Sequence, residues 1–227
     1  GLIAKAADPQ AQWPLRSWMG LLQDGAGRFE DAAATWTALA AEQAPQRLPL
    51  PPTSTPREQW PALASFLPTD PMVLLLWGLP GSGVERLAAV FNAGGDMLSA
   101  DRFGPNPPAD RLQNYDTVAA LAAGTLDPAE LVSEWSAQRP ARGYLEGHII
   151  DWLVWWDNAL LLALRPHMPE ATLLIALRDP RDMLLDWLAF GAPAPFGLTS
   201  PQSAAGWLAV VLNQVATLHE KDLYPHR

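Results

Sequence analysis

A glycine-rich segment, residues 78–85 with the sequence GLPGSGVE, has the spacing of a phosphate-binding loop, G-x-x-x-x-G. The backbone N–H groups of such a loop and the start of the helix after it bind an anion without needing any particular side chain. In ATP and GTP hydrolases, a lysine and a hydroxyl residue come next and hold the phosphates and a magnesium ion. Here Val84 and Glu85 take these two positions. The segment therefore predicts an anion site and argues against a nucleotide hydrolase.

A second segment, residues 178–182 with the sequence RDPRD, supplies cationic side chains. Arginine presents a planar, permanently charged fork of N–H donors that matches a phosphate. Asp179 followed by Pro180 is typical of a helix start, whose positive end also favours an anion. The alternative interpretation is a capped helix with charges on its surface. Because each of the two segments follows an apolar run, we expect them to meet at one edge of the same sheet.

Those two apolar runs, residues 72–77 and 172–177, have the composition of buried strands. Short runs of this kind suit a parallel sheet that is covered on both faces. Helical segments separate and follow the runs, and three helix starts carry a capping side chain followed by proline, at 127–128, 179–180 and 200–201. Strands that alternate with helices predict an α/β fold, with flanking helices on a mostly parallel sheet.

A helical hairpin is predicted ahead of this α/β region. Apolar residues recur there at helical spacing, first at Leu15, Trp18, Met19 and Leu22, and after a glycine turn from Phe29 onward. The pattern resembles one tetratricopeptide repeat, a unit that stacks on neighbours to bury its apolar face. An ordinary helical hairpin is the alternative. We expect either that further repeats precede Gly1 or that the hairpin packs on the domain that follows it.

Eight prolines lie between positions 45 and 71. This density prevents a long helix and favours an extended connector. We therefore divide the chain into a tetratricopeptide-like hairpin at 1–45, a proline-rich linker at 46–71 and an α/β domain at 72–227.

The α/β region resembles the sulfotransferase family, from about residue 72 to the end of the chain. Residues 78–83 resemble the G-x-P-R-S-G-T-T loop that cradles the 5′-phosphosulfate of the donor, 3′-phosphoadenosine 5′-phosphosulfate, and residues 178–182 resemble the R-D-P-R-D segment that grips its 3′-phosphate. The resemblance implies a P-loop-like fold without a metal, and transfer of a sulfuryl group to a hydroxyl or amine of a small-molecule or peptide acceptor. The resemblance extends to two groups within the family: bacterial proteins in which tetratricopeptide repeats precede such a domain, and the tyrosylprotein sulfotransferases.

The resemblance assigns the donor site to Gly81, Ser82, Gly83, Val84, Glu85, Arg86, Arg178 and Asp186. Several of these residues depart from the family pattern. Gly81 stands where the family carries an arginine or a lysine. Val84 and Glu85 stand where it carries two hydroxyl residues.

Two acids are expected to weaken donor binding. Asp186 takes the place of the serine that follows Arg178 by eight residues, and Glu85 lies in the loop. Like charges ~4 Å apart repel by roughly 4 kcal/mol at an effective dielectric of ~20. Arg86 is a candidate replacement for the missing loop cation. The alternative is that Arg86 pairs with Glu85 or is exposed to solvent.

Two residues are candidates for the general base of such a reaction. Asp101 lies near the position where the tyrosylprotein enzymes carry a catalytic glutamate. His148 ends a segment that resembles the K-T-H segment of the cytosolic enzymes, with Glu146 in place of the lysine. Each has a structural alternative: Asp101 as a turn or surface residue, and His148 as a packed residue beside Ile149.

Composition narrows the classes of partner. The net charge of −9, from 15 basic and 24 acidic residues, argues against a nucleic acid. No apolar stretch reaches the ~20 residues of a membrane span, and the absence of cysteine excludes disulfides and thiolate metal sites. We expect a cytoplasmic protein. Trp152, Trp155 and Trp156, at helical spacing, predict a packed core rather than a stack of rings against a ligand.

Two functions remain open. The first is a sulfotransferase with an impaired donor site. The second is an inactive protein of the same fold that binds a protein partner through its hairpin. We also expect a chain truncated at both ends. Residues 207–227 resemble the family's long helix, which comes before a further strand and a Y-E-D-L segment, and that segment is absent.

Overall fold

The computed structural model describes residues 9–67, 72–94, 98–143, 149–190 and 196–227. Its helices and strands follow in the order α2 (Pro9–Gly25), α3 (Phe29–Gln43), β1 (Val73–Gly78), α4 (Val84–Gly94), β2 (Leu98–Ser99), α5 (Tyr115–Ala123), α6 (Pro128–Gln138), β3 (Ile149–Trp152), α7 (Leu161–His167), β4 (Ala171–Ala176), α8 (Pro180–Phe190) and α9 (Pro201–Glu220). The three predicted helix starts are confirmed: α6, α8 and α9 each begin at the proline that follows the capping residue.

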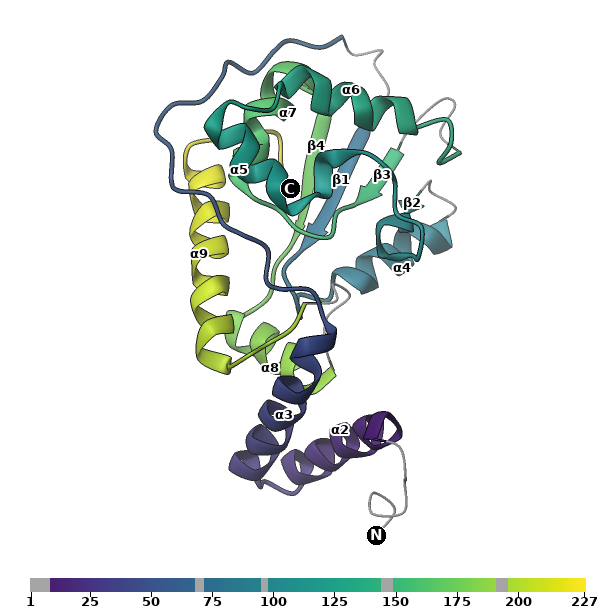
Figure 1. Cartoon of the computed structure of the whole chain (residues 1–227), viewed down its shortest axis with the longest axis vertical. Helices are drawn as coiled ribbons and strands as arrows, with labels where there is room; N and C mark the ends of the chain where they lie inside the picture. Colours follow the sequence, from purple (N-terminus) through teal and green to yellow (C-terminus); the bar gives the residue numbers. More distant parts are fainter. Residues whose placement is uncertain (1–8, 68–71, 95–97, 144–148, 191–195) are drawn as a thin grey trace.

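The strands form one parallel sheet in the order β2-β3-β1-β4 (Figure 1). Alternate residues of β1 face opposite sides of the sheet. Leu75 and Trp77 belong to the larger core, with α5, α6, α7 and α9. Leu76 belongs to a smaller core, where Val84 and Ala88 of α4 cover the other face. The predicted α/β class, a parallel sheet between flanking helices, is confirmed.

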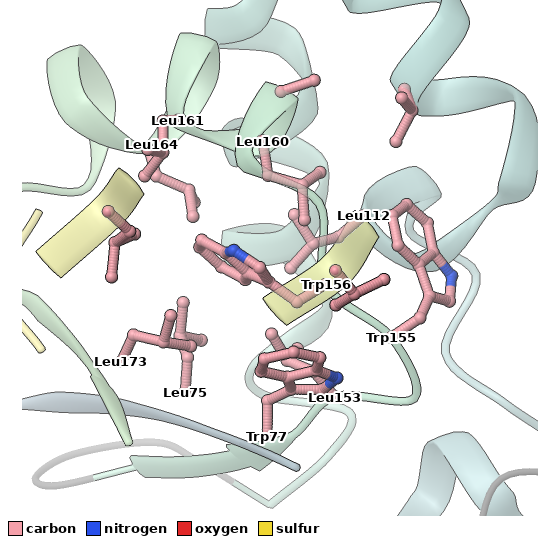
Figure 2. Close-up of a cluster of buried hydrophobic side chains, with 14 of the residues drawn as sticks. Leu75, Trp77, Leu112, Leu153, Trp155, Trp156, Leu160, Leu161, Leu164 and Leu173 are labelled. Atoms are coloured by element: carbon pink, nitrogen blue, oxygen red, sulfur yellow. The ribbon is translucent and has the colours of Figure 1, made fainter. Parts of the chain in front are cut away.

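Tryptophan fills much of the larger core. Trp77, Trp155 and Trp156 are almost fully buried among leucines (Figure 2). The predicted core role of Trp155 and Trp156 is therefore confirmed. The prediction that these tryptophans lie on a helix is wrong. Trp152 ends β3, and Trp155 and Trp156 lie in the irregular segment after it. The α-helix begins only at Leu161, after a short 3-10 turn that the carboxylate of Asp157 caps.

The helices α2 and α3 form a hairpin that packs on α8 (Figure 1). A Cβ atom on Gly20 would lie 2.2 Å from Nε1 of Trp36, so the two helices approach closely only because position 20 has no side chain. Trp36 also packs against Ala189 of α8, and the hydroxyl of Ser17 donates to the carbonyl of Ala189 at 2.6 Å. Of the two arrangements considered for the hairpin, the structure contains the one in which it packs on the following domain.

The proline-rich segment 49–67 contains no helix or strand and runs along the α/β region as a strap. It is attached both by apolar packing, with Leu50 and Trp60 against the larger core, and by hydrogen bonds. Ser54 donates from both its backbone N–H and its hydroxyl to Asp157, at 2.7 and 2.5 Å, and the carbonyl of Pro51 accepts from the indole of Trp207 at 2.9 Å. Residues 49–67 are thus held against the α/β region.

The last residues of the chain add to the sheet. Leu173 N donates to Pro225 O, and Arg227 N donates to Leu173 O, each at 2.9 Å, in a parallel arrangement beside β4. Within the described residues, no helix is both long and apolar enough to cross a membrane.

Candidate functional site

The loop between β1 and α4 has a backbone that glycine alone adopts without strain. The N–H of Ser82 donates to the carbonyl of Leu79 at 2.9 Å, which closes a turn with Pro80 at its second position and Gly81 at its third. Gly81 and Gly83 have φ angles of +75° and +80°. These left-handed conformations disfavour any residue with a Cβ atom.

The same loop packs directly against α8. A Cβ atom on Gly81 would lie 2.1 Å from the carbonyl oxygen of Met183. Since β1 and β4 are also paired, with Gly78 opposite Ala176, both sequence motifs leave the sheet at the same edge. The expected meeting of these two motifs is confirmed. The loop cation of the sulfotransferase pattern has no room at position 81, because α8 fills that space.

The loop presents donors that lack acceptors. In the part of the chain that the structure describes, no acceptor binds the N–H groups of Gly83, Val84 or Glu85, as is usual in the first turn of a helix. The hydroxyl oxygen of Ser82 is buried and also lacks a hydrogen-bond partner. Leaving such a group unsatisfied costs about 1–3 kcal/mol. Backbone N–H groups at the start of a helix are of the kind that binds an anion.

Three side chains of the first turn of α4 differ in environment. Val84 is buried in the smaller core, so its position serves packing. Glu85 and Arg86 are exposed, and no ion pair between them is present. A Cβ atom on Gly83 would lie 3.9 Å from Cδ of Arg86. The aliphatic part of this arginine therefore lies beside the loop.

The arginines of the RDPRD segment are paired with nearby carboxylates. Arg178 hydrogen-bonds to Asp186 and lies 3.5 Å from Asp182. Arg181 binds Asp179 at 2.6 and 3.0 Å, and its side chain and backbone N–H lower the pKa of Asp179 to about 2. The segment has the cations that a phosphate requires, but carboxylates already occupy them. Exposed pairs of this kind are weak, so an anion can compete for them.

Asp101 does not meet the loop. It follows β2, which lies two strands from β1, or about 10 Å at the usual strand spacing. Ser99 donates to its carboxylate at 2.7 Å, and Arg142 at 2.8 and 2.9 Å. Burial raises the pKa of Asp101, but the hydrogen bonds from Arg142 and Ser99 outweigh burial and leave this pKa below its usual value. A carboxylate held in this way is a weak base.

A buried ionic cluster that sequence reasoning missed lies next to Asp101. Asp151 of β3 is fully buried and accepts from Arg102 at 2.9 and 3.0 Å, from Arg142 at 2.7 Å, and from the indole of Trp135 at 2.7 Å. Arg102 also binds Asp110. Burial raises the pKa of Asp151, but the charges and hydrogen bonds of the two arginines more than offset it and hold this pKa well below its usual value. The only sign of this cluster in the sequence is Asp151 itself, an aspartate inside an apolar run.

The second base candidate, His148, lies outside the described residues. Among the residues that the structure describes, no group of three or more histidine, aspartate or glutamate side chains is arranged to hold a metal ion.

Comparison of the chain with protein-family models, with curated proteins and with solved structures found no match. Function must therefore be argued from the geometry of the site itself.

Proposed function

We propose that this protein has a sulfotransferase-like fold and binds the anionic end of 3′-phosphoadenosine 5′-phosphosulfate at the loop between β1 and α4. The observation that carries the proposal is the contact between Gly81 and α8, together with the orphaned hydroxyl of Ser82. Backbone N–H groups, this hydroxyl and Arg86 would hold the anion. The donor supplies the sulfuryl group, for transfer to a hydroxyl or amine of an unidentified acceptor.

Turnover is impaired in this proposal, for two reasons. Arg178 is engaged by Asp186 and must exchange this carboxylate for a phosphate of the donor. Asp101 is held by Arg142 and Ser99, so it is poorly suited to accept a proton from an acceptor. The part of the site near the loop thus fits the donor better than the part near Arg178 does.

A calorimetric titration with 3′-phosphoadenosine 5′-phosphate, the desulfated product of the donor, tests the proposal. We expect saturable binding with a Kd on the order of 0.1 mM, a free energy near −5 kcal/mol. Ser82→Ala and Arg86→Gln should each weaken it by about tenfold, the value of one charge-assisted or buried hydrogen bond. Arg28→Gln is the matched control, because Arg28 is exposed on the hairpin and pairs with Asp31. No heat at ~10 mM ligand, or equal effects of all three substitutions, would contradict the proposal.

A second candidate function is an inactive protein of this fold that binds a protein partner through a tetratricopeptide-like hairpin. It is favoured by the apolar residues that the hairpin exposes: Trp18 at 70%, Leu22 at 73% and Phe29 at 66%. A repeat of that class buries such residues against a neighbouring repeat. Failure of the nucleotide titration at every concentration would favour this function over the first.

A further inference from the structure

A pocket of about 410 Å³ lies where the hairpin meets the second half of α8. Its base is apolar and rigid, since Leu39, Trp187 and Phe196 are all at least 96% buried. Its rim is aromatic and open: Trp18 and Phe190 are 70% and 63% exposed. The volume falls within the range of ~300–1,000 Å³ that is typical of small-molecule sites.

Charge sets this pocket apart from the rest of the molecule. The chain carries a net charge of −9, yet no aspartate or glutamate is among the described residues that line the pocket, and Arg47 is their one charged side chain. Arg47 donates to the neutral amide oxygen of Gln43 at 2.9 Å. The nearest acid in the sequence, Glu42, is held by Arg16 through two hydrogen bonds. The positive charge of Arg47 is therefore not neutralised within the wall.

We propose that this pocket binds a planar aromatic carboxylate or sulfonate of about the size of naphthalene. The flat ring would lie between Trp18 of α2 and Phe190 of α8. Aromatic side chains favour offset or edge-to-face contact with another ring. The acidic group would bind the guanidinium of Arg47, which has four N–H donors besides the one that Gln43 accepts. The site goes beyond the proposed donor site and shares no residue with it.

The proposal is tested by titrating the whole chain with 2-naphthoate and with its neutral isostere 2-naphthamide, following tryptophan fluorescence. We expect the carboxylate to bind about tenfold more tightly than the amide, the value of one charge-assisted pair. Arg47→Gln should remove this preference, whereas Arg47→Lys should retain most of it. Ser82→Ala should change neither affinity, so failure of this site and failure of the donor site are distinguishable.

The aromatic rim has a matched control. Phe190→Ala should weaken both probes by about fivefold or more through lost ring contact. Phe29→Ala should leave both unchanged, because Phe29 is equally exposed, at 66%, but does not line the pocket. Circular dichroism of each variant checks that the helices remain folded. The proposal is overturned if neither probe binds, if Arg47→Gln keeps the carboxylate preference, or if the two phenylalanine variants behave alike.

Discussion

Asp186 changes what Arg178 can bind. At the family's serine position it was expected only to repel an anion, but in the structure it is the hydrogen-bond partner of that arginine. In the proposed donor site, its carboxylate would therefore compete with a phosphate for the guanidinium of Arg178. Asp182 is a weaker second partner, 3.5 Å from the same side chain.

Replacement of Asp186 by serine should therefore improve binding of 3′-phosphoadenosine 5′-phosphate. Removing one negative charge and freeing the fork should raise the affinity by about tenfold or more. Asp182→Ser is the matched control, because it removes the same charge without the short contact, and its effect should be smaller. Calorimetric titration of both variants measures the difference. Equal affinities in the two variants would show that Asp186 does not occupy the fork.

At the scale of elements, the hairpin depends on one close approach between its helices. Gly20 lies in the interior of α2, where glycine lowers helix stability relative to alanine by roughly 0.5–1 kcal/mol. The contact with Trp36 explains why a glycine is nevertheless present. Gly206, inside α9, has nothing within 4 Å of the position of its missing Cβ atom.

Alanine substitutions at these two glycines should have opposite effects. Gly206→Ala should raise the free energy of unfolding by about 0.5–1 kcal/mol through helix propensity. Gly20→Ala should lower it by about 1–3 kcal/mol, because the new methyl group overlaps the indole of Trp36. Urea unfolding followed by circular dichroism compares the two. Stabilisation by Gly20→Ala would mean that the helices are not in close contact there.

At the scale of the whole molecule, the cluster around Asp151 joins segments that are far apart in the sequence. Its carboxylate holds Arg102, which follows β2, and Arg142, which follows α6. The pKa of Asp151 is lower in the folded chain than in the unfolded chain, because the two arginines outweigh the effect of burial. This stabilisation is complete above the unfolded pKa of ~3.9 and is lost as the pH falls below that value.

Asp151→Asn should therefore lower the stability of the chain at neutral pH. Removing one partner from a buried ionic group costs about 3–5 kcal/mol, and the melting temperature should fall by about 10 °C. The loss should shrink as the pH falls below ~4, where the wild type begins to lose the same interaction. Asp31→Asn, which breaks the exposed pair with Arg28, should change little. Thermal unfolding at several pH values measures both variants.

Sequence patterns predicted the elements whose signals are local. The strands near Val73 and Ala171 are almost wholly apolar in sequence, and Pro180 marks the start of α8 after Asp179. The strand β3 was missed, because Asp151 interrupts its apolar pattern and the tryptophans after it have helical spacing. The pairing of Arg178 with Asp186 depends on how a helix leaves the sheet, which no local pattern records.

The contact of Gly81 with α8 also limits which substitutions the loop accepts. Even the smallest side chain at this position would overlap the backbone at Met183. A cationic side chain at position 81 therefore requires α8 to shift first. The order of substitutions, rather than their number, decides whether this loop can gain a cation.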